Sequence, residues 1–536
     1  MVTRCAPAPS AWAPFKYRAF TVLWTATVIS NIGTGMNTVG ASWLMTTLAP
    51  DPFMVALVQV ATMAPAFVLA LPSGALADIF DRRRLLLAVN GLMALVAATL
   101  AALVAIGWIN TASLLLCTFL LGTGAAFISP AWLSIVPQLV PRPTLGQAIV
   151  VNSMGINVSR AIGPALAGVL IVGLGFVAPF TVNALSFMVI ASALAWWRPT
   201  VAASSALPAE GVGEAIRNGL RYALHSAPLR ATLVRGVAFF LFASAYWALL
   251  PVIAKDSLGG GARLYGVLMG CVGVGAVLGA LLLPRVKPRL GTHGTVVAGS
   301  LGTALVLAVF SLIANPYAAA LASLLGGVSW LFVLSTLQVS AQLALPNWVR
   351  ARGLSIFLTL FFGSMALGSV IWGKTASVLG VDEALLIAAV GALLGIALTW
   401  RVRVGEGDVL DVAPSMHWPT PLVLLDTPQD RGPVMTAIEY RIDPADTPVF
   451  LALMAQQAQS RRRLGAIQWW IMEDAAAPGL YVEYFVEGSW LAHLRHHERV
   501  AGTDRLLQVR IYALHRGERP PAVRHLLAPP VGTTGD

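Results

Sequence analysis

The sequence is dominated by long apolar stretches, each close to the roughly 20 residues that a helix needs to cross a bilayer. Only 11% of its 536 residues are charged, whereas a soluble globular chain carries about 25%. Reading between charged residues and Pro or Gly breaks gives twelve candidate spans, at 19–48, 53–77, 85–107, 110–137, 145–173, 176–197, 232–254, 262–284, 292–314, 316–341, 350–378 and 382–402. The chain is therefore predicted to be an all-α membrane protein with twelve transmembrane helices and a separate C-terminal part.

Basic residues gather in every second link between these spans. They also precede the first span and follow the last, at Arg4, Lys16, Arg18, Arg82, Arg83, Arg84, Arg142, Arg198, Arg217, Arg221, Arg230, Arg285, Lys287, Arg289, Arg350, Arg352, Arg401 and Arg403. The opposite links hold only Lys255, Arg263 and Lys374. Because Lys and Arg accumulate on the cytoplasmic side, both termini are predicted to be cytoplasmic, with the protein in the plasma or inner membrane.

The two halves of the membrane part are similar to each other. A single offset aligns Gly74 with Gly279, Arg84 with Arg289, Pro141 with Pro346, Gly163 with Gly368 and Gly168 with Gly373. These matches predict two six-helix repeats at 19–197 and 232–402, with a cytoplasmic N-terminus at 1–18 and a cytoplasmic linker at 198–231. Such repeats are a transporter architecture, with the substrate path between them near mid-membrane.

Beyond the last span the composition changes to that of a water-soluble segment. Residues 403–433 are rich in Pro, Asp and Thr and are interpreted as a linker. Strand patterns at 434–442, 466–474, 479–488 and 506–516 alternate with helix patterns at 446–463 and 489–499. The order βαββαβ predicts an α+β ferredoxin-like domain over 434–516, and residues 517–536 are expected to form a loose tail.

A short charged segment, GALADIFDRRR, interrupts the apolar part of the chain. It resembles the loop motif of the major facilitator superfamily, in which a Gly, an Asp and a basic cluster recur, here Gly74, Asp78, Arg82, Arg83 and Arg84. The DRRR ending is similar to the branch of the enterobactin exporter and related transmembrane secretion effectors, part of which has a C-terminal soluble extension. The sequence departs from the family pattern at Ile79, where a basic residue is frequent, and at Asp81, where Gly is frequent.

The resemblance implies a gating role for this segment, because in the family it holds the cytoplasmic gate shut. Asp78 lies at a predicted helix end at the membrane edge, where an unpaired carboxylate is costly. An ion pair that forms in one conformation and breaks in the other would bias a two-state gate. The alternative for the three arginines is that they only fix the orientation of the chain.

A second segment, RAIGPALAG at 160–168, lies in the fifth span. Gly163, Pro164 and Gly168 resemble the antiporter motif of exporters, in which a Gly-Pro pair is followed by Gly. These residues would bend the helix and allow close packing. The counterpart at 368–373 lacks the proline. The motif favours export, and the alternative is ordinary small-residue packing.

Polar side chains within the spans are the candidates for substrate contact. They are Asn31, Gln59, Asn152, Asn157, Arg160, Asn183 and Gln338. Arg160 is the clear intramembrane charge among them, and such a charge is a functional hypothesis by default. The alternative for each amide is a hydrogen bond between helices, and for Arg160 it is pairing with helix-end carbonyls.

The predicted spans lack an obvious proton-binding group. Between Phe20 and Arg401 every acid falls in a link or at a helix end, so Asp78 is the remaining candidate for a proton-binding group. The chain has no GxxxxGK[ST] pattern, which argues against ATP-driven transport.

The soluble segment contains three histidines in one helix pattern. His493 and His497 are four residues apart, a spacing able to bind a metal. No carboxylate or Cys completes an obvious site, and Arg495 and Arg499 would repel a cation. A solvated amphipathic face that includes His496 is therefore the preferred interpretation, and neither a metal nor a cofactor is expected.

The same segment resembles small antibiotic-biosynthesis monooxygenase-like domains, which often pair into dimers. The aromatic residues of its strand patterns are interpreted as strand core, and the alternatives are a pocket lining and a pairing sheet; they are Trp469, Trp470, Tyr481, Tyr484 and Phe485.

Together these features predict a secondary transporter, not an enzyme, that exports a small molecule such as a siderophore or a drug by alternating access. The resemblance implies coupling to a proton. The expected partners are the small-molecule substrate and the lipid bilayer, without nucleic acid. Two alternatives remain open: a nutrient importer of the same fold, and a membrane-tethered enzyme or sensor that acts through the C-terminal domain.

Overall fold

The computed structural model describes residues 12–79, 81–141, 144–198, 212–346, 348–405, 415 and 431–529. The described residues fall into two compact units. The first contains the described residues up to 198 together with 234–338 and 357–403. The second contains 212–233, 339–356 and the described residues from 404 onward.

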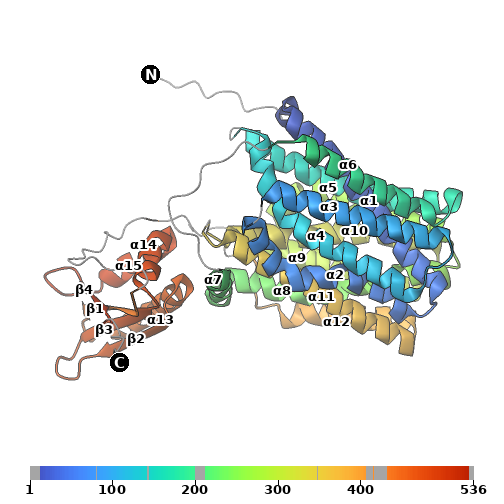
Figure 1. Ribbon diagram of the computed structural model, residues 1–536. Helices are drawn as coiled ribbons and strands as arrows, with labels where there is room; N and C mark the ends of the chain where they lie inside the picture. The colour runs from blue at the N-terminus through green and yellow to red at the C-terminus, as the bar shows by residue number, and fades with distance from the viewer. Residues whose placement is uncertain are drawn as a thin grey trace, which may run out of the picture. The chain divides into compact units, whose positions relative to one another are not determined.

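The first unit is a bundle of long apolar helices (Figure 1). The elements that contribute to it are η1 (Ala13–Lys16), α1 (Arg18–Leu48), α2 (Pro52–Ile79), α3 (Arg82–Ala105), α4 (Thr111–Leu139), α5 (Leu145–Leu174), α6 (Val177–Trp196), α8 (Ala227–Val252), η3 (Ile253–Ser257), α9 (Ala262–Leu312), α10 (Pro316–Leu343), α11 (Arg350–Leu379) and α12 (Val381–Leu398). All twelve predicted apolar segments are helical. Within the described ranges, nine helices are long and apolar enough to cross a membrane, and α1 and α5 are not among these nine.

The 51-residue helix α9 reverses direction at Gly291. Gly291 has φ 69° and ψ 173°, a backbone conformation that suits glycine because it lacks a Cβ atom. Gly279 before the break and Gly299 after it both lie against the same stretch of α10, around Val328 and Val333. A straight helix would separate these two glycines by about 30 Å. The segment is therefore two helices joined at Gly291, in agreement with the separate segments predicted at 262–284 and 292–314.

Glycines at equivalent positions of the two halves make equivalent contacts. A Cβ atom on Gly163 of α5 would meet a carbonyl of α1 at 2.8 Å, and one on Gly368 of α11 would meet a carbonyl of α8 at 2.5 Å. Gly122 of α4 likewise lies against α2, and Gly327 of α10 against α9. The offset that aligned the sequence halves relates both pairs, which supports the predicted duplication.

The second unit contains a four-stranded antiparallel sheet with the strand order β2-β3-β1-β4. Its elements after residue 433 are β1 (Val434–Arg441), α13 (Thr447–Leu464), β2 (Gln468–Glu473), β3 (Leu480–Glu487), α14 (Trp490–Arg499), α15 (Gly502–Tyr512) and β4 (Ala522–Leu527). Every second side chain of β3 is buried, as expected for a strand with one covered face. The core on that face includes Tyr440 of β1, Phe450 of α13, Phe485 of β3 and Ile511 of α15.

Two parts of the prediction for this domain are wrong. Residues 506–516 were predicted to be a strand, but most of them lie in α15, and β4 lies in the segment predicted to be a loose tail. The window carries Leu507 and Ile511 at helical spacing as well as an alternating pattern, so its periodicity fits either structure. In the helix, Ile511 packs in the core and is 1% exposed.

The predicted linker at 198–231 contains a helix that the sequence analysis missed, α7 (Val212–His225). Within the second unit, α7 packs against α13, and Arg221 donates a hydrogen bond to the carbonyl of Gly465 at 2.6 Å. The Tyr222 hydroxyl donates to the carbonyl of Ala344 at 3.0 Å. Most of the predicted linker at 403–433 lies outside the described residues.

Candidate transport pathway

The predicted gating segment runs from the end of α2 into α3. Asp81 is the N-cap of α3, and its Oδ1 accepts a hydrogen bond from the backbone N–H of Arg84 at 2.8 Å. The acid at a position where the family often has Gly therefore starts a helix. The side chain of Arg84 is exposed.

Arg83 joins the start of α3 to the end of α6. Its Nε donates to the carbonyl of Leu194 at 2.9 Å, and its terminal nitrogen donates to the carbonyl of Ala195 at 2.5 Å. The last carbonyls of a helix lack intrahelical partners and favour a cation. Of the other predicted gate residues, Gly74 and Asp78 lie in the last turns of α2 and Arg82 begins α3, but their surroundings lie outside the described residues.

The glycines of the predicted antiporter-like motif lie at two different helix–helix contacts. Gly163 and Pro164 lie against Gly35 of α1, within the first half. Gly168 meets the second half, because a Cβ atom on it would lie 2.8 Å from the Cα of Gly266 in α9. Its repeat partner Gly373 also crosses between the halves, against α2, where an added Cβ would lie 2.5 Å from a side chain.

The two halves share a buried core near the ends of α1 and α5 that are remote from the gating segment. This core includes Val39 and Trp43 of α1 together with Leu249 and Tyr265 of the second half. The rings of Trp43 and Tyr265 stack with their centroids 5.8 Å apart. A separate core that includes Phe20 contains only first-half residues among those that the structure describes. The buried core common to both halves therefore lies at one end of the bundle.

A lysine reinforces this contact between the halves. The Nζ of Lys255, in η3 after α8, donates a hydrogen bond to the carbonyl of Thr46 in the last turn of α1. The sequence analysis counted Lys255 only as one of three basic residues on the weakly basic side. A lysine on the side with few basic residues was the sequence signal that could have identified this contact.

The predicted pathway residues are spread over several helices. Asn31 is half-buried on α1, Gln59 is buried on α2, and Gln338 is exposed on α10. Asn157 and Arg160 lie on α5, and their side chains are outside the described residues.

Two of the candidate amides are buried between helices. The Oδ1 of Asn152 accepts a hydrogen bond from Nε1 of Trp132 in α4 at 3.2 Å, which is the helix–helix bond that the alternative interpretation expected. Asn183 on α6 is 1% exposed, and neither of its amide atoms has a partner among the described residues.

Sequence reasoning missed one buried charge, Arg235, near the start of α8. It is 3% exposed, its Nε donates to the carbonyl of Val402 at 3.2 Å, and its terminal nitrogen lies 3.2 Å from Nε2 of His293. The position of Arg235 inside a predicted span was the available signal, because intramembrane charges are rare.

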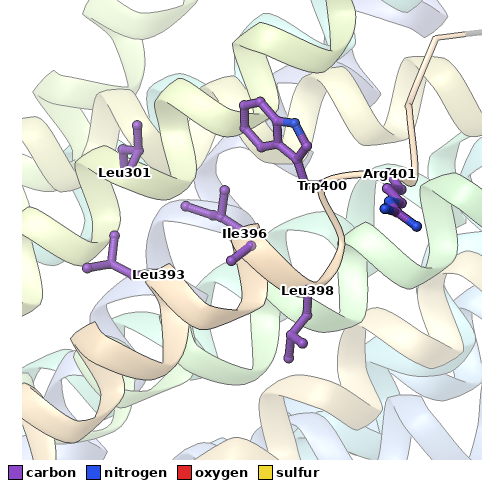
Figure 2. A pocket seen from close by; sticks show the side chains of 7 residues that line it. Leu301, Leu393, Ile396, Leu398, Trp400 and Arg401 are labelled. Carbon is purple, nitrogen blue, oxygen red and sulfur yellow. The ribbon is translucent and has the colours of Figure 1, made fainter.

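A groove of about 650 Å³ lies beside the end of α12, outside the contact between the halves (Figure 2). It is lined by Leu301, Leu393, Ile396, Ala397, Leu398, Trp400 and Arg401. Leu398 and Trp400 are 84% and 58% exposed. Its lining comes from the second half alone, so the groove belongs to the outer surface of that half and is no candidate for a path between halves.

In the soluble domain, the interpretation of α14 as a solvated face is wrong for two of its histidines. His493 and His496 are 0% exposed, and the Nδ1 atom of each lies 2.6 Å from a carboxylate oxygen of Glu487. The predicted strand core is confirmed for Tyr481 and Phe485, which are buried, whereas Trp469 and Tyr484 are half-buried and Trp470 is 40% exposed.

A bundle of long apolar helices in close contact through glycines indicates a membrane-embedded protein. The chain belongs to the transmembrane secretion effector family, whose model matches residues 9–531. This confirms the resemblance drawn from the gating segment, and it makes the protein a transporter and not an enzyme.

Two curated relatives are transporters. The chain is 24% identical over 366 residues to the staphyloferrin A transporter of Staphylococcus aureus, covering 68% of this chain and 90% of the relative. It is 26% identical over 397 residues to the multidrug efflux pump Tap of Mycolicibacterium fortuitum, covering 72% and 96%.

Solved structures of transporters share the fold. A bacterial homologue of the human lysosomal transporter Spinster, in an inward-facing and unoccupied conformation, aligns with a TM-score of 0.58 and 15% identity, over 73% of this chain and 99% of that chain. A POT family transporter in complex with a thioalcohol-conjugated peptide aligns with a TM-score of 0.60 and 14% identity, over 72% and 96%.

Proposed function

We propose that the protein is a secondary active exporter of a small molecule, siderophore-like or drug-like, with twelve membrane spans and both termini in the cytoplasm. The observation that carries the mechanism is the core shared by both halves at one end of the bundle. The names of the two relatives support the substrate class, since one is a staphyloferrin A transporter and the other a multidrug efflux pump.

In alternating access, the substrate path would be closed at one end of the bundle and then at the other. At the end described above, Gly168 and Gly373 bring helices of opposite halves into close contact, and the rings of Trp43 and Tyr265 stack in the shared core, so this end would open by separating these contacts. At the other end, we propose that Asp78 pairs with a basic group when that end is closed. The same carboxylate is the proposed proton-binding group, and Asn31, Gln59, Asn157, Arg160 and Gln338 are proposed to face the path.

The test is accumulation of labelled siderophores and drugs in a strain that lacks the protein and is complemented with it, with and without a protonophore. The wild-type protein should lower accumulation, and the protonophore should reverse this. Asp78→Asn should abolish export while substrate binding stays measurable. Asp81→Asn is the matched control, because Asn is as good an N-cap as Asp and export should persist.

Each outcome is decisive. If the Asp78→Asn protein exports at the wild-type rate, Asp78 is neither the gate residue nor the proton-binding group. If the wild-type protein raises the accumulation of a labelled compound, the protein is a nutrient importer and not an exporter. Export that is insensitive to the protonophore would exclude proton coupling.

We further propose that the C-terminal domain is of the ferredoxin-like type and pairs into dimers. The antiparallel order β2-β3-β1-β4 supports this assignment, and the exposed side chain of Trp470 supports pairing through the sheet. Removing residues 405–536 tests the enzyme alternative. Export by the truncated protein would leave the domain a regulatory part, whereas an activity confined to the isolated domain would favour the enzyme or sensor.

A further inference from the structure

Three histidines of the soluble domain converge from two elements that are separated in the sequence. His493 and His497 lie one turn apart on α14, and His525 lies on β4, opposite Thr436 of β1. One ring nitrogen from each histidine lies within 4.8 Å of the others. The Nε2 atoms of His493 and His497 are 3.2 Å apart.

In its neutral form, His493 can offer a nitrogen to the cluster. Its Nδ1 lies 2.6 Å from an oxygen of Glu487, and a carboxylate accepts, so in the neutral ring Nδ1 carries the proton and Nε2 presents a lone pair. A carboxylate behind a histidine is typical of metal ligands, where it fixes the tautomer and raises the basicity of the ring. In a tetrahedral zinc site with Zn–N bonds of about 2.05 Å, ligand nitrogens are about 3.3 Å apart. The Nε2 atoms of His493 and His497 are 3.2 Å apart, and the three ligand nitrogens lie within 4.8 Å of one another.

The structure shows where one of the two neighbouring arginines lies. The guanidinium of Arg499, which was expected to repel a cation, lies over the ring of Trp348 at 4.1 Å. The indole of Trp490 packs against His493 with ring centroids 5.2 Å apart, and this tryptophan is buried. An apolar ring therefore flanks the cluster.

We propose that His493, His497 and His525 form a binding site for a divalent transition cation such as Zn²⁺, with Glu487 as the positioning residue of His493. Three protein ligands leave the fourth tetrahedral position to water or to an exchangeable ligand. The ion would tie β4 to α14. The proposal does not depend on the transported substrate.

The test uses the full-length protein, purified in detergent, stripped with a chelator and titrated with Zn²⁺ alone or Co²⁺ alone. One ion should bind per chain, and Co²⁺ should give the intense visible absorption of tetrahedral coordination. Glu487→Gln should weaken binding about 10–100-fold, and His525→Gln should weaken it further. His515→Gln, which changes a half-buried histidine outside the cluster, is the matched control and should bind as the wild-type protein does.

The proposal would be overturned by no stoichiometric binding by the wild-type protein, or by binding by His525→Gln equal to that of the control. Limited proteolysis reports whether each variant keeps a folded domain. His497 and His525 are both half-buried, so if one variant unfolds the domain the other carries the test. Cobalt that binds without the tetrahedral spectrum in the wild-type protein would also contradict the site.

Discussion

The two units bury their polar groups in different ways. In the helical bundle, buried hydroxyls return to their own helix: Thr118 donates to the carbonyl of Leu114 at 2.8 Å, for example. In the soluble domain, buried charges are bonded across elements, as Arg461 of α13 is to Glu483 of β3 at 2.9 Å, with both side chains at most 2% exposed. A buried ion pair that is bonded across elements fixes one arrangement of those elements, whereas a hydroxyl bonded within its own helix does not.

The largest effect is expected from breaking the buried ion pair. Glu483 also accepts hydrogen bonds from Tyr440 and Trp469, so Glu483→Gln leaves Arg461 buried without its counter-charge. The free energy of unfolding of the domain should fall by about 3–5 kcal/mol. Proteolysis of the full-length protein at increasing urea concentrations measures it.

The control for this prediction is Glu439→Gln. Glu439 pairs with Arg524 at the surface, with side chains 31% and 66% exposed, so its loss should cost at most about 1 kcal/mol. Equal losses for the two variants would mean that burial does not set the strength of these pairs.

A smaller effect is expected from a methyl group between the halves. Gly168→Ala would place a Cβ atom 2.8 Å from the Cα of Gly266, so the state in which the halves meet should lose about 1–3 kcal/mol. Distances between spin labels on the two halves should shift toward the separated state. Gly173→Ala, on the same helix with open space around it, should leave them unchanged.

A weaker shift in the same direction is expected from Lys255→Met. It removes the charged donor to the carbonyl of Thr46, and a cation at a helix C-terminus contributes about 0.3–1 kcal/mol. Arg263→Met, which removes an exposed charge from a neighbouring position, is the control for net charge. Label distances that match the wild type in both variants would show that the lysine does not hold the halves together.

Away from the contact between the halves, a pH dependence is expected in the C-terminal domain. The lowered pKa values of His497 and His525 mean that the unfolded chain binds their protons more readily than the folded domain does. Stability should therefore fall as the pH drops below the ordinary histidine value of about 6.5, until the folded rings titrate near pH 4 and 3. In chelator, the melting temperature of the domain should drop by a few degrees between pH 7 and pH 5.

The matched variant for the pH effect carries His497→Gln and His525→Gln together. Its melting temperature should change less with pH than that of the wild-type protein. An unchanged slope would assign the acid sensitivity to other groups.

The features that could be predicted from the sequence are those that depend on local pattern. Apolar stretches of membrane length became helices, and the repeated glycines Gly163 and Gly368 became equivalent contacts, because both signals lie within single segments. The contact of Lys255 with α1 and the burial of Arg235 depend on which helices meet, and one sequence does not reveal this.

The histidine cluster was missed for a similar reason. His525 was placed in a tail, because β4 is a six-residue strand whose pairing with β1 spans most of the domain. Once the last strand was assigned to residues 506–516, no third ligand could be found near His493. The error in secondary structure therefore hid the proximity of His525 to His493.

The position of β4 also bears on how the protein is made. β1, the first strand of the domain, pairs with β3 on one side and with β4 on the other. While the ribosome has not yet released the last residues, one edge of β1 is open, and an open strand edge is a template for pairing with other chains. A chain truncated before residue 522 would leave that edge of β1 permanently exposed. Quality-control proteases could thus tell a finished chain from an unfinished one.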